Sequence, residues 1–208
     1  MFPLGEGLTE RIARLAHPVT LRLSAANAAV ERELTEILQA VCGPAWKTTV
    51  LTHYQREART MVRLAGADRL WPMEFWGIPT GFVLDGLVEA MEALTGAMAR
   101  MDWSETIQHT LFNLPRPVSA QLFVGATCSF CHPMIHRAIQ VAALQARVTF
   151  DVIPVDQFPD VAEAARIRST PSLYDPTTGQ TLAANVPPAH LAAWLYQTAF
   201  SGLPAGAR

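Results

Sequence analysis

Two cysteines stand three positions apart in the stretch GATCSFCHPMIHR, residues 125–137, and a histidine directly follows the second. Cys128, Cys131 and His132 are residue types that form redox-active disulfides, attach haem covalently or bind metal ions. Each of these chemistries requires the side chains to lie in a particular structural setting. The elements that surround the pair therefore decide which chemistry the sequence supports.

The cysteine pair is expected where a strand meets a helix. The apolar stretch 119–125 reads as a strand, and residues 131–146 follow with helical periodicity. Cys128 is expected to close the strand and open the helix, where free backbone N–H groups and the helix dipole favour a thiolate. Cys131, one turn along and deeper, is expected to resolve a mixed disulfide by forming the Cys128–Cys131 bond.

The composition of the chain indicates a globular protein. Half of its 208 residues are hydrophobic, and the formal net charge of -2 is spread without charged blocks, so neither nucleic acid nor an anionic membrane is an expected partner. The N-terminal stretch lacks the pattern of a signal peptide, so we expect a cytoplasmic protein, either a monomer or a homodimer. In a reducing compartment, a close cysteine pair is more typical of catalysis or metal binding than of a structural scaffold.

The expected elements occur twice in the same order. Each half starts with a helix and continues with a strand, a helix, a strand, a hairpin and a final helix, although the second half inserts a short helix before its hairpin. This repetition predicts an α/β architecture, with one half over residues 1–114 and the other over residues 115–208. The expected ranges are 8–15, 19–25, 28–43, 47–54, 59–77 and 82–96, then 103–114, 119–125, 131–146, 147–156, 158–167, 171–185 and 188–200.

The second half resembles the thioredoxin and glutaredoxin fold, because the C-x-x-C pair is followed 40 residues later by Thr170-Pro171 and a hairpin. The whole chain resembles the N-terminal region of the flavoprotein subunit of alkyl hydroperoxide reductase, and also the glutaredoxin-like protein disulfide oxidoreductases. Both are built from two fused thioredoxin-like folds. The stretches that carry the resemblance are LTERIARLAHPVTLRL, EFWGIPTGFVLDGL, CSFCHP and STPSLY.

This resemblance implies a thiol-disulfide oxidoreductase whose first half lacks a dithiol and whose second half is catalytic. Cys128 and Cys131 would cycle between dithiol and disulfide. Electrons would pass from a thioredoxin-reductase-like flavoprotein to a peroxiredoxin or another protein disulfide. The resemblance also implies a cis Thr170-Pro171 bond in a substrate-docking loop, and Phe130 is expected to grip partners.

The resemblance does not extend to every position. No G-x-G-x-x-G stretch is present, so we expect no bound cofactor, and flavin and NAD(P)H would belong to a partner reductase. The relatives carry a glutamate where this chain has Val83, so either His132 or water is expected to accept the proton of Cys131. The first half also lacks a proline near Arg59-Thr60, which agrees with a non-catalytic role.

Other interpretations of the pair remain open. CSFCH fits the attachment motif for c-type haem, but the missing export signal and the downstream proline argue against it. His132 and His136 could complete a zinc site with the cysteines, although zinc ligands usually come from two separate elements, so we expect no metal. His132 also fits a solvated residue of the first helical turn. A non-enzymatic redox-sensing or chaperone-like binding module using the same dithiol is the alternative function.

Overall fold

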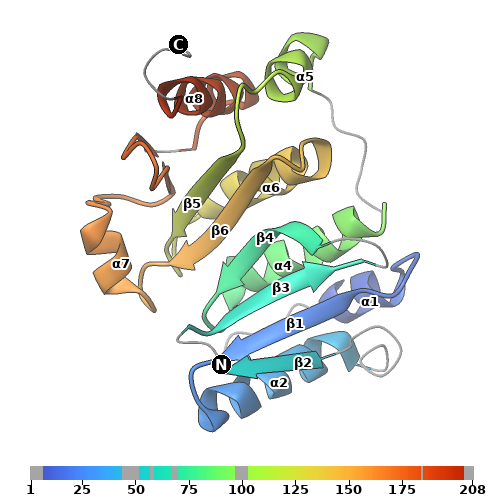
Figure 1. Cartoon of the computed structure of the whole chain (residues 1–208). Coiled ribbons are helices and arrows are strands. Elements are labelled where there is room, and N and C mark those ends of the chain that lie inside the picture. The colour runs from blue at the N-terminus through green and yellow to red at the C-terminus, as the bar shows by residue number, and fades with distance from the viewer. Residues whose placement is uncertain are drawn as a thin grey trace. The chain divides into compact units, whose positions relative to one another are not determined.

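The computed structural model describes residues 7–43, 52–56, 59–66, 70–96, 103–183 and 185–203. Contacts between residues divide the chain into two compact units, Met1–Ala99 and Arg100–Arg208. Each unit combines a sheet with helices (Figure 1), which is the α/β architecture that the sequence predicts.

The first unit contains a mixed sheet with the strand order β2-β1-β3-β4. Its strand β1 pairs in parallel with β2 and antiparallel with β3, and β3 pairs antiparallel with β4. The hairpin that the sequence predicts within 59–77 is therefore confirmed over the described residues. The elements of this unit are α1 (Gly7–Ala13), β1 (Thr20–Ala25), α2 (Ala28–Cys42), β2 (Thr52–Arg56), β3 (Met61–Ala65), β4 (Leu70–Trp76) and α4 (Gly81–Leu94).

The second unit has the strand order β6-β5-β7-β8, with the same directions of pairing. Its central strand β5 is parallel to β6 and antiparallel to β7, and β7 pairs antiparallel with β8. The elements are α5 (Glu105–Phe112), β5 (Val118–Val124), α6 (Cys131–Leu144), β6 (Val148–Pro154), α7 (Pro159–Ala164), β7 (Ser172–Tyr174), β8 (Thr181–Ala183) and α8 (Pro188–Ser201).

The boundary between the units differs from the one expected at residue 114, because α5 packs within the second unit against α8. Leu111 of α5 is buried, and its carbonyl accepts a hydrogen bond of 2.9 Å from the buried Gln145 side chain. Just before α5, the Trp103 indole donates to Gln140 of α6 at 3.0 Å. These contacts agree with the repeated order of elements, in which the helix over residues 103–114 starts the second half, and the boundary expected at residue 114 was too late in the sequence.

The core of the second unit explains why one of the two cysteines is buried. Apolar residues recur on one face of α6, and this face is buried beside the sheet. Cys131 is the first residue of that buried stripe, followed one turn later by Met134 and Ile135. Its 0% exposure therefore follows from the helical period of the sequence.

Candidate redox site

The cysteine pair lies in two successive turns between β5 and α6. The Cys128 N–H donates to the Gly125 carbonyl at 3.2 Å, and the Cys131 N–H donates to the Cys128 carbonyl at 3.0 Å. The helix begins at Cys131, so the expectation that Cys128 itself opens the helix was wrong by three residues. The turns, which need only local hydrogen bonds, separate Cys128 from the end of the strand. Cys128 therefore lies just before the helix N-terminus, at the positive end of the helix dipole.

A disulfide joins Cys128 and Cys131, whose Cα atoms are 5.4 Å apart. The two sulfur-bearing residues differ in exposure, since Cys131 is fully buried while Cys128 is partly exposed. Thiol-disulfide exchange requires direct contact between the attacking sulfur and its target. After reduction, Cys128 is therefore the cysteine that an external disulfide can reach, whereas Cys131 can reach only its neighbour.

The loop around Pro171 packs against the cysteine turn. A Cβ atom placed on Gly125 would lie 3.0 Å from Thr170 Oγ1 and 3.6 Å from Cys128 Cβ, so both residues lie next to Gly125. The Thr170–Pro171 peptide bond is cis. The Ser172 hydroxyl donates to the Ser169 carbonyl at 2.7 Å and closes the turn around it. The structure thus brings the expected docking residues Thr170 and Pro171 to Cys128, and their docking role stays a prediction.

Two further residues of the expected site flank Cys131. Phe130 lies between the cysteines, immediately before the first residue of α6, and 63% of it is exposed. Exposure of a large apolar side chain to water is unfavourable in free energy, and a bound partner would remove it. The exposure of Phe130 is therefore compatible with partner contact. His132 is partly buried in the first turn of α6. Its expected part in tuning Cys128 or relaying a proton stays a prediction.

The possible proton acceptors near the dithiol are few. Among the described residues of the second unit, Asp175 is the only buried carboxylate, and it follows β7 at the end opposite Pro171. Gln121 of β5 is uncharged and partly exposed. Val83 is a buried residue of α4 in the first unit. Within the part of the chain that the structure describes, no three His, Cys, Asp or Glu side chains gather closely enough to hold a metal ion.

The corresponding strand-to-helix junction of the first unit has polar caps instead of cysteines. Asn27 precedes α2, and its side-chain oxygen accepts hydrogen bonds from the N–H groups of Ala29 at 3.0 Å and Val30 at 3.1 Å. The neighbouring Ala26 N–H donates to Thr60 Oγ1 at 3.3 Å. The donors that could stabilise a thiolate at such a junction therefore have partners here. This arrangement agrees with a unit that carries no dithiol.

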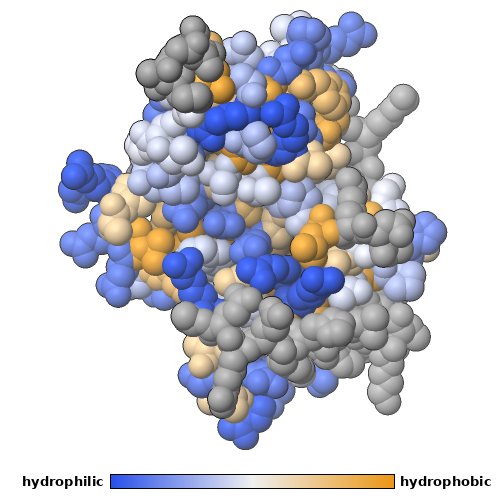
Figure 2. Space-filling view, viewed as in Figure 1, coloured by the Kyte–Doolittle hydropathy of each residue, from blue (hydrophilic) through white to orange (hydrophobic). Residues whose placement is uncertain are grey.

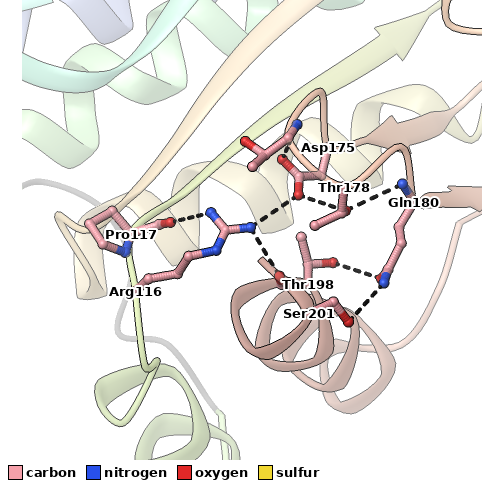
Figure 3. Close-up of polar contacts among 8 residues, drawn as sticks. Arg116, Pro117, Asp175, Thr178, Gln180, Thr198 and Ser201 are labelled. Atoms are coloured by element: carbon pink, nitrogen blue, oxygen red, sulfur yellow. Dashed lines mark hydrogen bonds and ion pairs between the residues drawn. The ribbon is translucent and has the colours of Figure 1, made fainter. Parts of the chain in front are cut away.

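A buried polar network that the sequence did not reveal lies at the far end of β7 (Figure 3). Arg116 Nη2 donates to Asp175 Oδ2 at 3.3 Å and to the Thr198 carbonyl of α8 at 3.0 Å, and Nη1 donates to the Pro117 carbonyl at 2.9 Å. The fully buried Asp175 also accepts from Thr178 Oγ1 at 2.8 Å. The network ties the start of β5 to the β7–β8 turn and to the C-terminal end of α8.

The fold is thioredoxin-like, and the second unit has a C-x-x-C disulfide between β5 and α6. The N-terminal domain of the alkylhydroperoxide reductase AhpF from Enterococcus faecalis is similar, with a TM-score of 0.75 and 20% identity over 90% of this chain and 95% of that one. A protein disulfide oxidoreductase from Aeropyrum pernix gives a TM-score of 0.71 and 15% identity over 95% of this chain and 93% of that one. At these identities the likeness shows the fold, and it agrees with the resemblance noted in the sequence.

A curated relative extends the comparison to sequence. The F subunit of alkyl hydroperoxide reductase from Xanthomonas campestris pv. phaseoli is 24% identical over 172 residues, which are 80% of this chain. The chain spans only 31% of the length of that relative. No protein-family model matches the chain. Among the described residues, none of the helices combines the length and apolar character that crossing a membrane requires.

Proposed function

We propose that the chain is a thiol-disulfide oxidoreductase made of two thioredoxin-like folds, a non-catalytic first unit and a catalytic second unit. The observation that carries the proposal is the Cys128–Cys131 disulfide, in which one cysteine is partly exposed and the other fully buried. The packing of Thr170 against the same turn supports a substrate-docking loop beside the exposed sulfur. The likeness of the fold to a protein disulfide oxidoreductase agrees with this activity.

In the reduced protein, the Cys128 thiolate would attack one sulfur of a substrate disulfide. A mixed disulfide forms, and the other substrate sulfur leaves as a thiolate. The Cys131 thiol then loses its proton to His132 or to water, and its thiolate attacks the Cys128 sulfur. This step releases the second substrate thiolate and restores the Cys128–Cys131 disulfide, so two electrons have passed to the substrate.

The next turnover requires two electrons from an external dithiol. We propose that a separate thioredoxin-reductase-like flavoprotein supplies them. The redox group of this chain would be the dithiol, while flavin and NAD(P)H would belong to that partner. A peroxiredoxin or another protein disulfide would be the acceptor. The similarity to a component of alkyl hydroperoxide reductase supports a partner of this kind.

Trapping of the intermediate tests the proposal. The Cys131→Ser variant should accumulate a mixed disulfide between Cys128 and a substrate protein, because the resolving thiol is absent. The Cys128→Ser variant should accumulate none, and mass spectrometry under non-reducing conditions distinguishes the two. The reverse result would overturn the assigned roles. The wild-type protein should reduce insulin disulfides with dithiothreitol or with a flavoprotein reductase as the electron source. If it does so with neither, the enzymatic proposal fails, and a redox-sensing or chaperone-like binding module becomes the better interpretation.

A further inference from the structure

A pocket of about 370 Å³ lies at the same edge of the second unit's sheet as the dithiol. Strands β5 and β6 are parallel, with Val124 opposite Pro154, so both end at this edge. The Val155 N–H, just beyond β6, donates to the Val124 carbonyl at 2.9 Å, and Val155 lines the pocket. Figure 1 shows α7 next to the ends of both strands.

The opposite wall of the pocket leads directly into the Thr170 loop. Residues 166–168 line the pocket, and Arg168 is only two positions before Thr170. Two residues of extended chain span at most about 7 Å between Cα atoms. Since Thr170 and Cys128 both lie next to Gly125, a polypeptide held at Cys128 can extend into the pocket without leaving the edge of the sheet.

The lining of the pocket combines apolar and charged residues. The apolar part comes from Val155, Pro159, Ala162 and Ile167, and the charged part from Glu163, Arg166 and Arg168. In the space-filling view, hydrophobic and hydrophilic side chains lie next to one another over the region of α7 (Figure 2). Asp156 and Asp160 belong to the same segment but do not line the pocket.

Both arginines present exposed side chains. Among the residues that the structure describes, neither Arg166 nor Arg168 forms an ion pair, although Glu163 lines the same pocket. The pocket therefore offers two guanidinium groups against one carboxylate. A guanidinium binds a carboxylate through paired, directional hydrogen bonds, which makes an acidic side chain the ligand of matching charge.

The backbone at Arg166 is also unusual. Its φ is 56°, and it follows the end of α7 where the Ile167 N–H donates to the Ala162 carbonyl at 2.9 Å. Glycine is the residue that such a helix end normally uses, because a side chain is disfavoured at positive φ. An arginine at this position, in spite of the unfavourable backbone conformation, suggests a role for the guanidinium that lines the pocket.

We infer that this pocket is a specificity subsite for the substrate polypeptide and that it favours an acidic residue close to the reactive cysteine. The inference rests on the proposed thiol-disulfide exchange at Cys128. An apolar side chain of the substrate would cover Val155 and Ile167, while a neighbouring carboxylate would pair with Arg166 or Arg168. The occupant is a peptide segment of the substrate protein.

The test uses two synthetic peptides that differ only beside a disulfide-bonded cysteine. Glutamates flank this cysteine in one peptide, and lysines flank it in the other. The reduced protein should reduce the acidic peptide about three- to tenfold faster, measured as the second-order rate of thiol release at low salt. In the variant Arg166→Glu/Arg168→Glu this preference should reverse. With the wild type, the ratio of the two rates should fall as salt is raised to about 0.5 M, because the charges are exposed to solvent and are screened.

The matched control is Arg22→Glu/Arg32→Glu, which changes the net charge equally at two exposed arginines of the first unit. This variant should keep the preference of the wild type. Equal rates for the two peptides, or a preference that the pocket variant leaves unchanged, would overturn the inference while the proposed function stands. If the reduced protein reduces neither peptide, the proposed function fails and the inference fails with it.

Discussion

Thr170 lies so close to Gly125 that no side chain fits at residue 125 without a shift of its neighbours. A Cβ atom at this glycine would lie 3.0 Å from Thr170 Oγ1 and 3.6 Å from Cys128 Cβ. The first distance is shorter than an ordinary van der Waals contact, so an alanine would push the Thr170 loop and the cysteine turn apart. The geometry of the site therefore depends on the absence of a side chain at residue 125.

The first prediction concerns this contact. Gly125→Ala should lower kcat/KM for insulin reduction about tenfold, because overpacking costs about 1–2 kcal/mol and displaces Thr170 from the attacking sulfur. Gly7→Ala is the control, since a Cβ there has no neighbour within 4 Å. Steady-state kinetics of both variants measure the effect. Unchanged kcat/KM in Gly125→Ala would show that the contact between loop and turn does not matter for exchange.

The second prediction concerns the network around Arg116. A Cβ atom on Gly202 would overlap the guanidinium, which cannot move without losing its hydrogen bonds to Asp175 and Thr198. The φ of Gly202 is -80°, so alanine is tolerated by the backbone itself. Gly202→Ala should therefore lower the free energy of unfolding by about 1–3 kcal/mol through this contact alone.

A double-mutant cycle in urea isolates that contact. Arg116→Ala alone should cost about 3 kcal/mol or more, because it leaves the buried carboxylate of Asp175 without its cation. Adding Gly202→Ala to this variant should cost nothing further, since the guanidinium that it would displace is gone. Additive losses would mean that Gly202 is needed for some reason other than the space it leaves to Arg116.

The third prediction concerns the free cysteine of the first unit. Burial raises the pKa of the Cys42 thiol to about 11 from an ordinary value of 9.0. Between about pH 9 and pH 11 the unfolded chain loses this proton while the folded chain keeps it, so stability falls as the pH rises. The loss should reach about 2–3 kcal/mol, and below about pH 9 Cys42 should have no effect on the pH dependence.

Urea unfolding of the wild type and Cys42→Ala at about pH 8 and about pH 10.5 measures the difference. The variant should lose less stability than the wild type between the two values. Native alkylation gives an independent measurement, because Cys42 should react with iodoacetamide at the lower pH only after unfolding. Rapid labelling of Cys42 in the folded protein would show that its thiol is accessible to solvent rather than buried.

The order of elements could be predicted from the sequence because local signals mark it. Asn27, a residue type that favours helix N-caps, caps α2, and the apolar period over residues 131–146 corresponds to α6. The cysteine pair could be found for the same reason, since its spacing is local. The expected range also started at Cys131, where α6 begins, but the turns that separate Cys128 from that helix depend on backbone hydrogen bonds between Gly125, Cys128 and Cys131 that the sequence pattern does not show.

The parts of the structure that the sequence did not reveal depend on contacts between distant residues. Arg116 and Asp175 are 59 positions apart, and neither lies in a recognisable motif. The pocket beside α7 arises only when the end of β6 and residues 166–168 come together. No local pattern encodes these juxtapositions.

The central place of β5 in its sheet limits the direction from which a partner can come. Its backbone is already paired with β6 along one side, over residues 118–124, and with β7 along the other, over residues 121–123. A substrate chain therefore finds no free edge along residues 121–123 of β5, the strand that leads into the cysteine turn. It must approach end-on, over the tips of the strands, where Phe130, Thr170 and the α7 pocket lie.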